Sequence, residues 1–464
     1  MVSDITKYNY EKEIYTGIFL ELIICFIVDV FIKSNLFMIS IIGNIAFFLA
    51  IYIYLNDILL IACTLISSFT LIFLEYNMRL PHFISYIEDG LIMMMAIKLF
   101  IGYMKKRIRI NNMYMFIILF ICISICSYIV NPLSLSLYVK GLYYDYLRYF
   151  IVGVFTFYYS FSKEQIKKIA KILWYALLLQ VPIIIYQCTH TSVYWTPKSQ
   201  VVIKQDFYSG FLGWRSTTEF GLFAMISLTL LFILYMKSKI SLKYLILASV
   251  VIIIGCIIAE VKFVFILIPI MFLYVVCTDI SIKSMSVFVV TILMLIFGAF
   301  QIVKLYPEFD NFYNSKSVEK YSKDSYGSSG VGRTTSFLVA NKMISTNLSN
   351  RLVGYGAGSA NSLSDSYRFS QFSVAQYIVE DGYLGILCMY LWYVYIINIS
   401  LKIVKYKKDE FENIIGHTGV IFASAIIFST FLNDSMVKIN FSVLSWMIMG
   451  GVYKYYYLHV KEFK

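Results

Sequence analysis

Charge is scarce in this sequence. Asp, Glu, Lys and Arg make up only 14% of the 464 residues, whereas 60% are hydrophobic and the mean hydropathy is +0.75. A water-soluble chain of this length needs far more polar surface. The apolar residues stand in long blocks, and a helix that crosses the ~30 Å hydrocarbon core of a bilayer needs about 20 of them. The composition therefore excludes an ordinary soluble domain and predicts a membrane protein.

The patterns of metal, disulfide and secreted proteins are also missing. The eight cysteines form no CxxC pair and the four histidines are scattered, so we expect no metal site, no disulfide framework and no cofactor. The cysteines lie in or beside apolar blocks, which predicts small buried side chains. The first dozen residues are polar and of mixed charge, so we expect the first apolar block itself to direct insertion.

The net charge of +12 does not indicate nucleic-acid binding, because the basic residues cluster in short connections between apolar blocks. Such clusters mark the cytoplasmic side of a membrane protein. With the cluster at 105–109 placed inside, the other clusters also fall inside and both termini are cytoplasmic. These other clusters lie at 163–171, 237–243, 402–408 and 454–464.

The apolar blocks predict an all-α, polytopic bundle of about 12–14 spans that forms one membrane domain over residues 1–464. Two outer loops are long enough to have a function, at 190–218 and 304–373. In the second loop, residues 334–346 are predicted to form a helix. We detect no internal repeat and no broken helix. The predicted spans are 14–32, 36–55, 58–75, 83–104, 113–130, 144–161, 171–189, 219–236, 243–260, 262–278, 285–303, 374–401, 414–432 and 438–457.

Charged residues near the outer ends of the spans are candidates for a functional site, because charge in a bilayer is costly. Arg215 and Glu219 are four residues apart and would share a helix face, either as a local ion pair or as site residues. Lys262 stands at a tight outer joint, as a turn marker or as a cation at the mouth of a cavity. Arg148 and Asp145 lie among tyrosines, which suit either sugar rings or an interfacial aromatic belt.

Glycine-rich segments add further candidates. Arg333 follows Gly332 at the start of the predicted loop helix, an arrangement that suits phosphate. Arg351 precedes the Gly-rich turn 354–358. Glu380 and Asp381 lie about two turns into a predicted span. This acidic pair suits either a general base or pairing between helices.

Several of these segments together resemble the bacterial O-antigen and capsule polymerases (Wzy-type), which are related to the O-antigen ligases. The resemblance covers about residues 213–390, and the N-terminal third matches only in hydropathy. The ligases carry a histidine ahead of the acidic-glycine motif, and this chain has none there. The matching segments are 216–221, 260–262, Gly332 with Arg333, 352–358, and 380–385, which reads Glu-Asp-Gly-Tyr-Leu-Gly.

The resemblance implies a metal-independent glycosyltransferase in the bacterial cytoplasmic membrane. It would join repeat units carried on undecaprenyl pyrophosphate, and its partners would include a flippase and a chain-length regulator of the same pathway. The implied base is Glu380 or Asp381, with Glu219 next. The implied pyrophosphate and glycan ligands are Arg215, Lys262 and Arg333, followed by Arg351 and Arg148. An O-antigen ligase-like transferase and a lipid-linked oligosaccharide flippase or other transporter are the alternatives.

Overall fold

The structure is a computed structural model, and every regular element in its described part is helical, without a strand. The prediction of an all-α protein is therefore confirmed. The residues that the structure describes are 36–76, 80–81, 84, 86–105, 112–159, 163–190, 208–213, 216–259, 261, 263–278, 285–293, 333–362, 373–406, 410–432 and 439–458.

The helices begin and end within a few residues of most predicted spans, because long apolar runs are a local property of the sequence. The predicted span 14–32 and the second half of 285–303 lie outside the described residues. The helices that correspond to predicted spans are α2 (Leu36–Leu55), α3 (Asp57–Tyr76), α4 (Tyr86–Met104), α5 (Asn112–Val130), α7 (Arg148–Tyr158), α8 (Lys163–Thr189), α9 (Thr217–Met236), α10 (Leu242–Ile258), α11 (Val264–Thr278), α17 (Ser373–Tyr406), α18 (Glu410–Leu432) and α19 (Ile439–Tyr456).

Five helical segments of the described part are long and apolar enough to cross a membrane. On α17, Leu387, Leu391 and Val394 are about half exposed and recur at helical spacing. An exposed apolar stripe of this kind is typical of a helix that faces hydrocarbon. The five segments are Asp57–Glu75, Lys163–Thr189, Thr217–Met236, Val374–Tyr406 and Glu410–Phe431.

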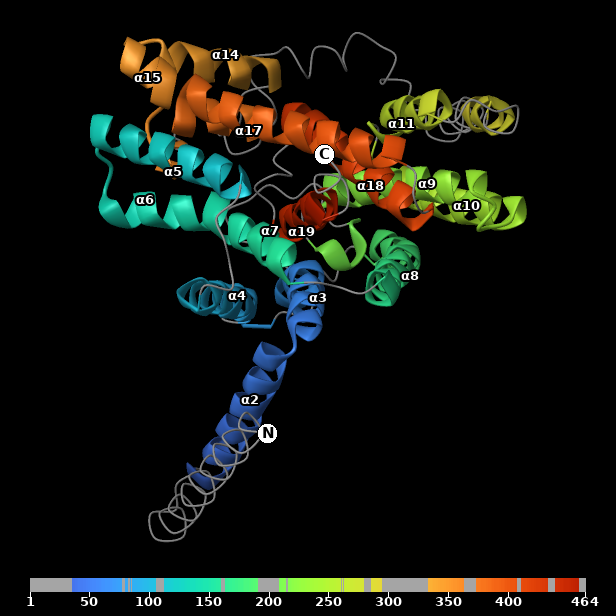
Figure 1. The fold of residues 1–464 in the computed structure, drawn as a ribbon, viewed down its shortest axis with the longest axis horizontal. Coiled ribbons are helices and arrows are strands. Elements are labelled where there is room, and N and C mark those ends of the chain that lie inside the picture. The colour runs from blue at the N-terminus through green and yellow to red at the C-terminus, as the bar shows by residue number, and fades with distance from the viewer. Residues whose placement is uncertain are drawn as a thin grey trace. The chain divides into compact units, whose positions relative to one another are not determined.

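The chain divides into two compact units, 1–63 and 64–464, and the candidate residues all belong to the second. Within the second unit, α17 packs against α5, α18 and α19, while α9 packs against α10, α11 and α18. A short helix, α6 (Leu135–Leu142), runs through the π-helical turn η2 (Tyr143–Leu147) directly into α7 (Figure 1). π-helical turns inside α-helices are frequent at functional sites.

The described part of the predicted loop 304–373 consists of short helices and the Gly-rich turn 354–358, and it packs on α17. It contains α14 (Arg333–Ile344), α15 (Leu348–Val353) and α16 (Ser359–Ser362), and α14 and α15 lie alongside α17 (Figure 1). Ala340 and Ile344 form an apolar cluster with Val374 and Ile378 of α17. The predicted helix at 334–346 is thus confirmed, and it is anchored to α17 by burial of apolar surface.

The prediction that the cysteines are small buried side chains is wrong for four of the seven cysteines that the structure describes. Cys256 and Cys388 are buried, Cys63 is partly buried, and the other four described cysteines are exposed on apolar helices. None of the seven described cysteines forms a disulfide. An apolar block predicts contact with hydrocarbon or with protein equally well, so it does not show which faces are covered.

The crossing of α7 and α19 provides a first testable prediction. A Cβ at Gly450 would collide with the carbonyl oxygen of Gly153, whereas a Cβ at Gly451 would meet only Thr156, at 3.9 Å. Small residues allow such close helix approach in membranes. We expect Gly450→Val to cost about 1–3 kcal/mol by overpacking. The measurement is the Tm of the purified protein in detergent. Gly451→Ala is the control, and equal Tm values would contradict the prediction.

Candidate functional site

The acidic-glycine motif is the point at which α17 is broken. Gly382 has φ 62° and ψ −165°, so the helix stops there and begins again. In an unbroken helix the carbonyl groups of Val379 and Glu380 would accept amides four residues further along. Here Tyr355 N donates to Val379 O (2.7 Å) and Gly356 N donates to Glu380 O (2.8 Å). The expectation that no helix is broken is therefore wrong, and the Gly-rich turn 354–358 supplies the missing donors.

The turn fits into the break because its glycines allow backbone to lie against backbone. A Cβ on Gly354 would lie 2.5 Å from Glu380 O, and a Cβ on Gly382 would lie 2.6 Å from Gly354 N. Gly354 also has a positive φ, of 72°. On the other side of the turn, a Cβ on Gly141 of α6 would collide with the backbone of Gly358. Two motifs that the sequence analysis named separately thus form one structure.

Polar groups of α5 hold the turn in place. Asn131, just after α5, donates from one nitrogen to Asn350 Oδ1 and to Gly354 O, both at 2.8 Å. Ser127 Oγ donates to Glu380 O at 3.2 Å. The break in α17 is therefore satisfied by protein groups from both sides, as irregular backbone at membrane depth requires.

Asn131 gives the second prediction. Because its amide bonds both the turn and α15, Asn131→Ala leaves two buried acceptors without their donor, at a cost of about 1–3 kcal/mol. We expect faster protease cleavage within 345–362 and a lower Tm. Ser349→Ala is the control, since Ser349 is exposed on α15 beside Asn350 and its hydroxyl donates to Asn347 Oδ1, at the start of the same helix. Equal cleavage rates in the two variants would contradict the role of Asn131.

Directly at the break, Glu380 and Asp381 are both completely buried. The phenol of Tyr146, in η2, donates to Asp381 Oδ2 at 2.5 Å and lies 3.1 Å from Glu380 Oε2. One hydroxyl thus joins the two carboxyl groups. Among the described residues, no Lys or Arg nitrogen lies within ion-pair distance of either carboxyl group.

A third carboxyl group, which the sequence analysis did not connect with the pair, belongs to the same cluster. Gln376 Nε2 lies 3.3 Å from Asp145 Oδ2 and 3.4 Å from Glu380 Oε1, and both Asp145 and Gln376 are buried. Gln376 and Glu380 are four residues apart on α17, a signal that they share a face. We name Asp145, Tyr146, Gln376, Glu380 and Asp381 the carboxyl cluster.

Two acceptor atoms of the carboxyl cluster have no donor in the described part of the chain. They are Asp381 Oδ1 and Gln376 Oε1. Both Glu380 oxygens, in contrast, lie within hydrogen-bond distance of a donor, Tyr146 or Gln376. Buried polar atoms in native structures normally have partners. These two oxygens can therefore each accept a hydrogen bond from a further donor.

Arg148 stands near the cluster, partly buried at the start of α7. Its guanidinium donates to Tyr149 Oη at 2.7 Å and lies over the rings of Tyr144 and Tyr149, at 5.3 Å and 4.8 Å. Glu88 of α4, which is not among the predicted site residues, is also buried. Tyr146 and Tyr149 are buried as well, so neither the exposed sugar surface nor the interfacial belt describes them.

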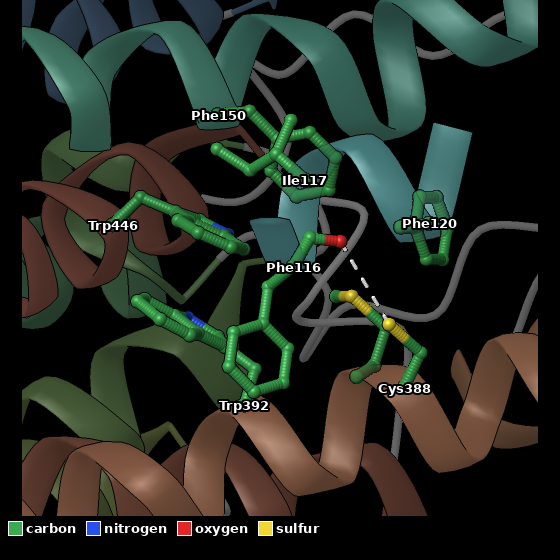
Figure 2. Close-up of a pocket in the computed structure, with 8 residues that line it drawn as sticks. Phe116, Ile117, Phe120, Phe150, Cys388, Trp392 and Trp446 are labelled. Carbon is green, nitrogen blue, oxygen red and sulfur yellow. Dashed lines mark hydrogen bonds between the residues drawn. The ribbon is translucent and has the colours of Figure 1, made fainter. Parts of the chain in front are cut away.

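Aromatic side chains pack against one side of the carboxyl cluster, between Tyr146 and Trp392. Tyr146 packs on Phe120 (centroids 4.7 Å apart), and Phe150 packs on Trp446 (4.8 Å). Trp446 lies nearly parallel to Trp392 at 6.0 Å. Phe120, Phe150, Trp392 and Trp446 line a cavity of about 10 Å³. Figure 2 shows these four rings together with Cys388, which also lines the cavity. A cavity of this size holds at most about one water molecule, so this side of the cluster is dry.

Beside the cluster, α6 carries a buried tyrosine that precedes the predicted span. Tyr138 stacks on Tyr128 at 4.5 Å and lies 3.4 Å from Ser124 Oγ. Burial raises the pKa of Tyr138, the hydrogen bond to Ser124 opposes this, and the negative charge of Asp381 raises the pKa further. The Tyr138 hydroxyl is therefore a neutral donor at physiological pH.

The other predicted site residues do not join the cluster in the described structure. Glu219 is buried in the first turn of α9, and Arg351 is exposed on α15, where its guanidinium lies 3.5 Å from Ser345 O. Arg333 opens α14, but its side chain is outside the described part. Arg215 and Lys262 are also outside the described residues.

The segment before Arg215 is firmly held by α8. Gln187 exchanges two hydrogen bonds with the backbone of Gly210, at 3.0 and 2.8 Å, and Gln180 Oε1 accepts from Phe211 N at 2.5 Å. Both glutamines are buried. These two glutamines were not predicted as site residues. They are seven residues apart and so share one face of an apolar helix, which indicates a specific contact.

The described residues contain no group of three or more His, Cys, Asp or Glu side chains arranged to hold a metal ion. No known protein-family model matches the chain, and no curated protein matches it.

Proposed function

We propose that this chain is a membrane glycosyltransferase that polymerises oligosaccharide repeat units carried on undecaprenyl pyrophosphate, at the outer face of the bacterial cytoplasmic membrane. The observation that carries the proposal is the docking of the Gly-rich turn into the break of α17, directly beside the carboxyl cluster. The proposal includes about 12–14 spans, both termini in the cytoplasm, and the 304–373 segment outside.

In this proposal Asp381 is the general base. Its Oδ1 has no donor in the described part of the chain, while its Oδ2 is held by Tyr146. Both oxygens of Glu380 lie within hydrogen-bond distance of donors, on Tyr146 and Gln376. Glu380 therefore holds these neighbouring side chains in position and does not contact the substrate. Glu219, on α9, is a less favoured base because it lies on a different helix from the cluster.

The reaction needs a base and a stabilised leaving group. The carboxylate of Asp381 takes the proton of the acceptor hydroxyl, and that oxygen forms a bond to the anomeric carbon of the donor sugar. The bond between the anomeric carbon and the pyrophosphate oxygen breaks, and undecaprenyl pyrophosphate leaves with the electron pair. Cations then stabilise the negative charge that develops on the leaving group.

The cations proposed for this role are those that the resemblance implies. Arg148 stands three residues after Asp145 of the cluster, and its ring contacts hold the guanidinium in one place. Arg351 lies on α15, which packs directly on α17. Arg215, Lys262 and Arg333 complete the proposed set. Because the cluster is buried, the glycan reaches Asp381 only if the turn or the segments around it move.

A transporter of lipid-linked oligosaccharide is the second candidate, and the break in α17 is the observation that favours it. Discontinuous helices with buried acidic residues are common at the binding sites of secondary transporters. An O-antigen ligase-like transferase is the third, and Gln376 occupies the region where the ligases carry a histidine.

One experiment separates the three. A strain that lacks the gene is compared with its complemented parent by electrophoresis of the surface glycan. A collapse to single exported repeat units supports the polymerase. Loss of all exported units, with lipid-linked units trapped inside, would establish the transporter instead. Long chains that stay on the lipid carrier would establish the ligase.

A further inference from the structure

A second cavity, of about 250 Å³, lies away from the carboxyl cluster. Its walls come from α9, α10, α11 and the helical segment 285–293. Most of the lining is hydrocarbon, from residues such as Leu228, Leu245, Ile253, Ile268 and Phe272, and the polar lining residues carry only hydroxyl groups and no charge. A cavity of this size with apolar walls is not filled by water and accepts apolar molecules.

The cavity opens to the side of the helices. Leu242, Ile246 and Val290 belong to its lining and are 45%, 39% and 47% exposed. These side chains lie on apolar helices, where the surroundings in a bilayer are hydrocarbon chains. The cavity therefore has its entrance where a lipid chain can enter without crossing water.

The length of the cavity matches one leaflet. Its lining on α10 extends from Leu242 to Ile253. At 1.5 Å per residue this stretch is about 16 Å long. Half of the ~30 Å hydrocarbon core is about 15 Å. A single acyl chain, extended along α10 from its N-terminal end, fits this length.

Positive charge gathers at the Leu242 end of the cavity. Lys237 follows α9 directly, and Lys243 lies in the first turn of α10. A third lysine, Lys239, lies in the turn between α9 and α10, and its Nζ is 2.7 Å from Glu410 Oε2. Lysines at the membrane surface attract anionic head groups, by about 1 kcal/mol each.

We propose that this cavity binds one acyl chain of an anionic phospholipid whose phosphate lies against Lys237 and Lys243. The lipid comes from the leaflet in which the turn between α9 and α10 lies. It fills the space between α10 and 285–293 and so stabilises the packing of this part of the chain. This proposal is independent of the proposed function and stands if the protein is a transporter.

The test uses the purified, delipidated full-length protein in detergent and native mass spectrometry. The probes are phosphatidylglycerol, phosphatidylcholine with the same chains, and undecaprenyl phosphate. Ser249→Trp fills the cavity, and Ser249→Leu is a milder variant in case the first does not fold. Lys237→Gln/Lys243→Gln removes the charge. The controls are Val250→Trp, an exposed position of α10 outside the cavity, and Lys402→Gln/Lys405→Gln.

We expect the wild-type protein to bind phosphatidylglycerol at least fivefold more tightly than phosphatidylcholine. Filling the cavity, or removing the two lysines, should weaken this binding about fivefold or more, while the controls bind as the wild type does. Equal binding by the filled variants, or equal binding of the two phospholipids, would overturn the proposal. It would also be overturned if undecaprenyl phosphate displaced phosphatidylglycerol at equal concentration, which would identify a site for the carrier lipid.

Discussion

We expect Gly382→Ala to detach the Gly-rich turn from α17 and to abolish polymer formation. Gly382 has φ 62° and ψ −165°, a backbone region that essentially only glycine occupies, so alanine there costs about 1–3 kcal/mol in the backbone alone. In addition, the alanine Cβ would lie 2.6 Å from Gly354 N and from Leu352 O. These are backbone atoms, so a change of side-chain rotamer cannot relieve the clash. The hydrogen bonds from Tyr355 and Gly356 to α17 would then be lost, and the carboxyl cluster with them.

The measurement is the length distribution of the surface glycan in a null strain that carries the variant, with membrane protein level determined in parallel. Gly90→Ala is the matched control, because a Cβ at this helical glycine meets nothing within 4 Å. Gly354→Ala should reproduce the defect, because its Cβ would lie 2.5 Å from Glu380 O and would also push the turn away from α17. The double variant should then be no worse than either single one. Full-length polymer from a well-expressed Gly382→Ala protein would refute the role of the break.

The helices could be predicted from the sequence, because an apolar run is recognised from neighbouring residues alone. The break at Gly382 could not be recognised in this way. The residues after it, from Tyr383 on, are as apolar as those of any continuous span, so the block shows no gap. What breaks the helix is a tertiary contact with the turn 354–358, and only the fold provides it.

The part of the candidate site that could be predicted consists of residues that differ from their neighbours in the sequence. Glu380, Asp381 and the Gly-rich turn stood out as polar or glycine residues in an apolar context. Asp145 stood out as a charged residue, but Tyr146 did not stand out among the neighbouring tyrosines. Nothing in the sequence connects either residue with Glu380, which lies more than two hundred positions further along the chain. Asp145 and Tyr146 also occupy a π-helical turn, so the ordinary helical period does not indicate which of them faces inward.

The second large effect is expected for Asp381→Asn, which should lower chain extension by about 10²–10⁴-fold, the usual contribution of a general base. The amide is nearly the same size as the carboxyl group and can still accept from Tyr146, so we expect the protein to fold and to reach the membrane at wild-type level. The measurement is the rate of chain extension by purified protein supplied with lipid-linked repeat units.

Variants of neighbouring groups distinguish a base at Asp381 from a general need for buried carboxyl groups. Because Glu380 and Tyr146 position Asp381, Glu380→Gln and Tyr146→Phe should each have a smaller effect, of about tenfold, and should change the dependence of the rate on pH. Glu412→Gln is the control, since Glu412 is a buried carboxyl group on α18, outside the cluster. Equal loss in Asp381→Asn and Glu412→Gln would indicate a general need for buried carboxyl groups. Loss of lipid-linked sugar transport, with extension intact in detergent, would show that the cluster moves substrate across the membrane and that Asp381 is not a base.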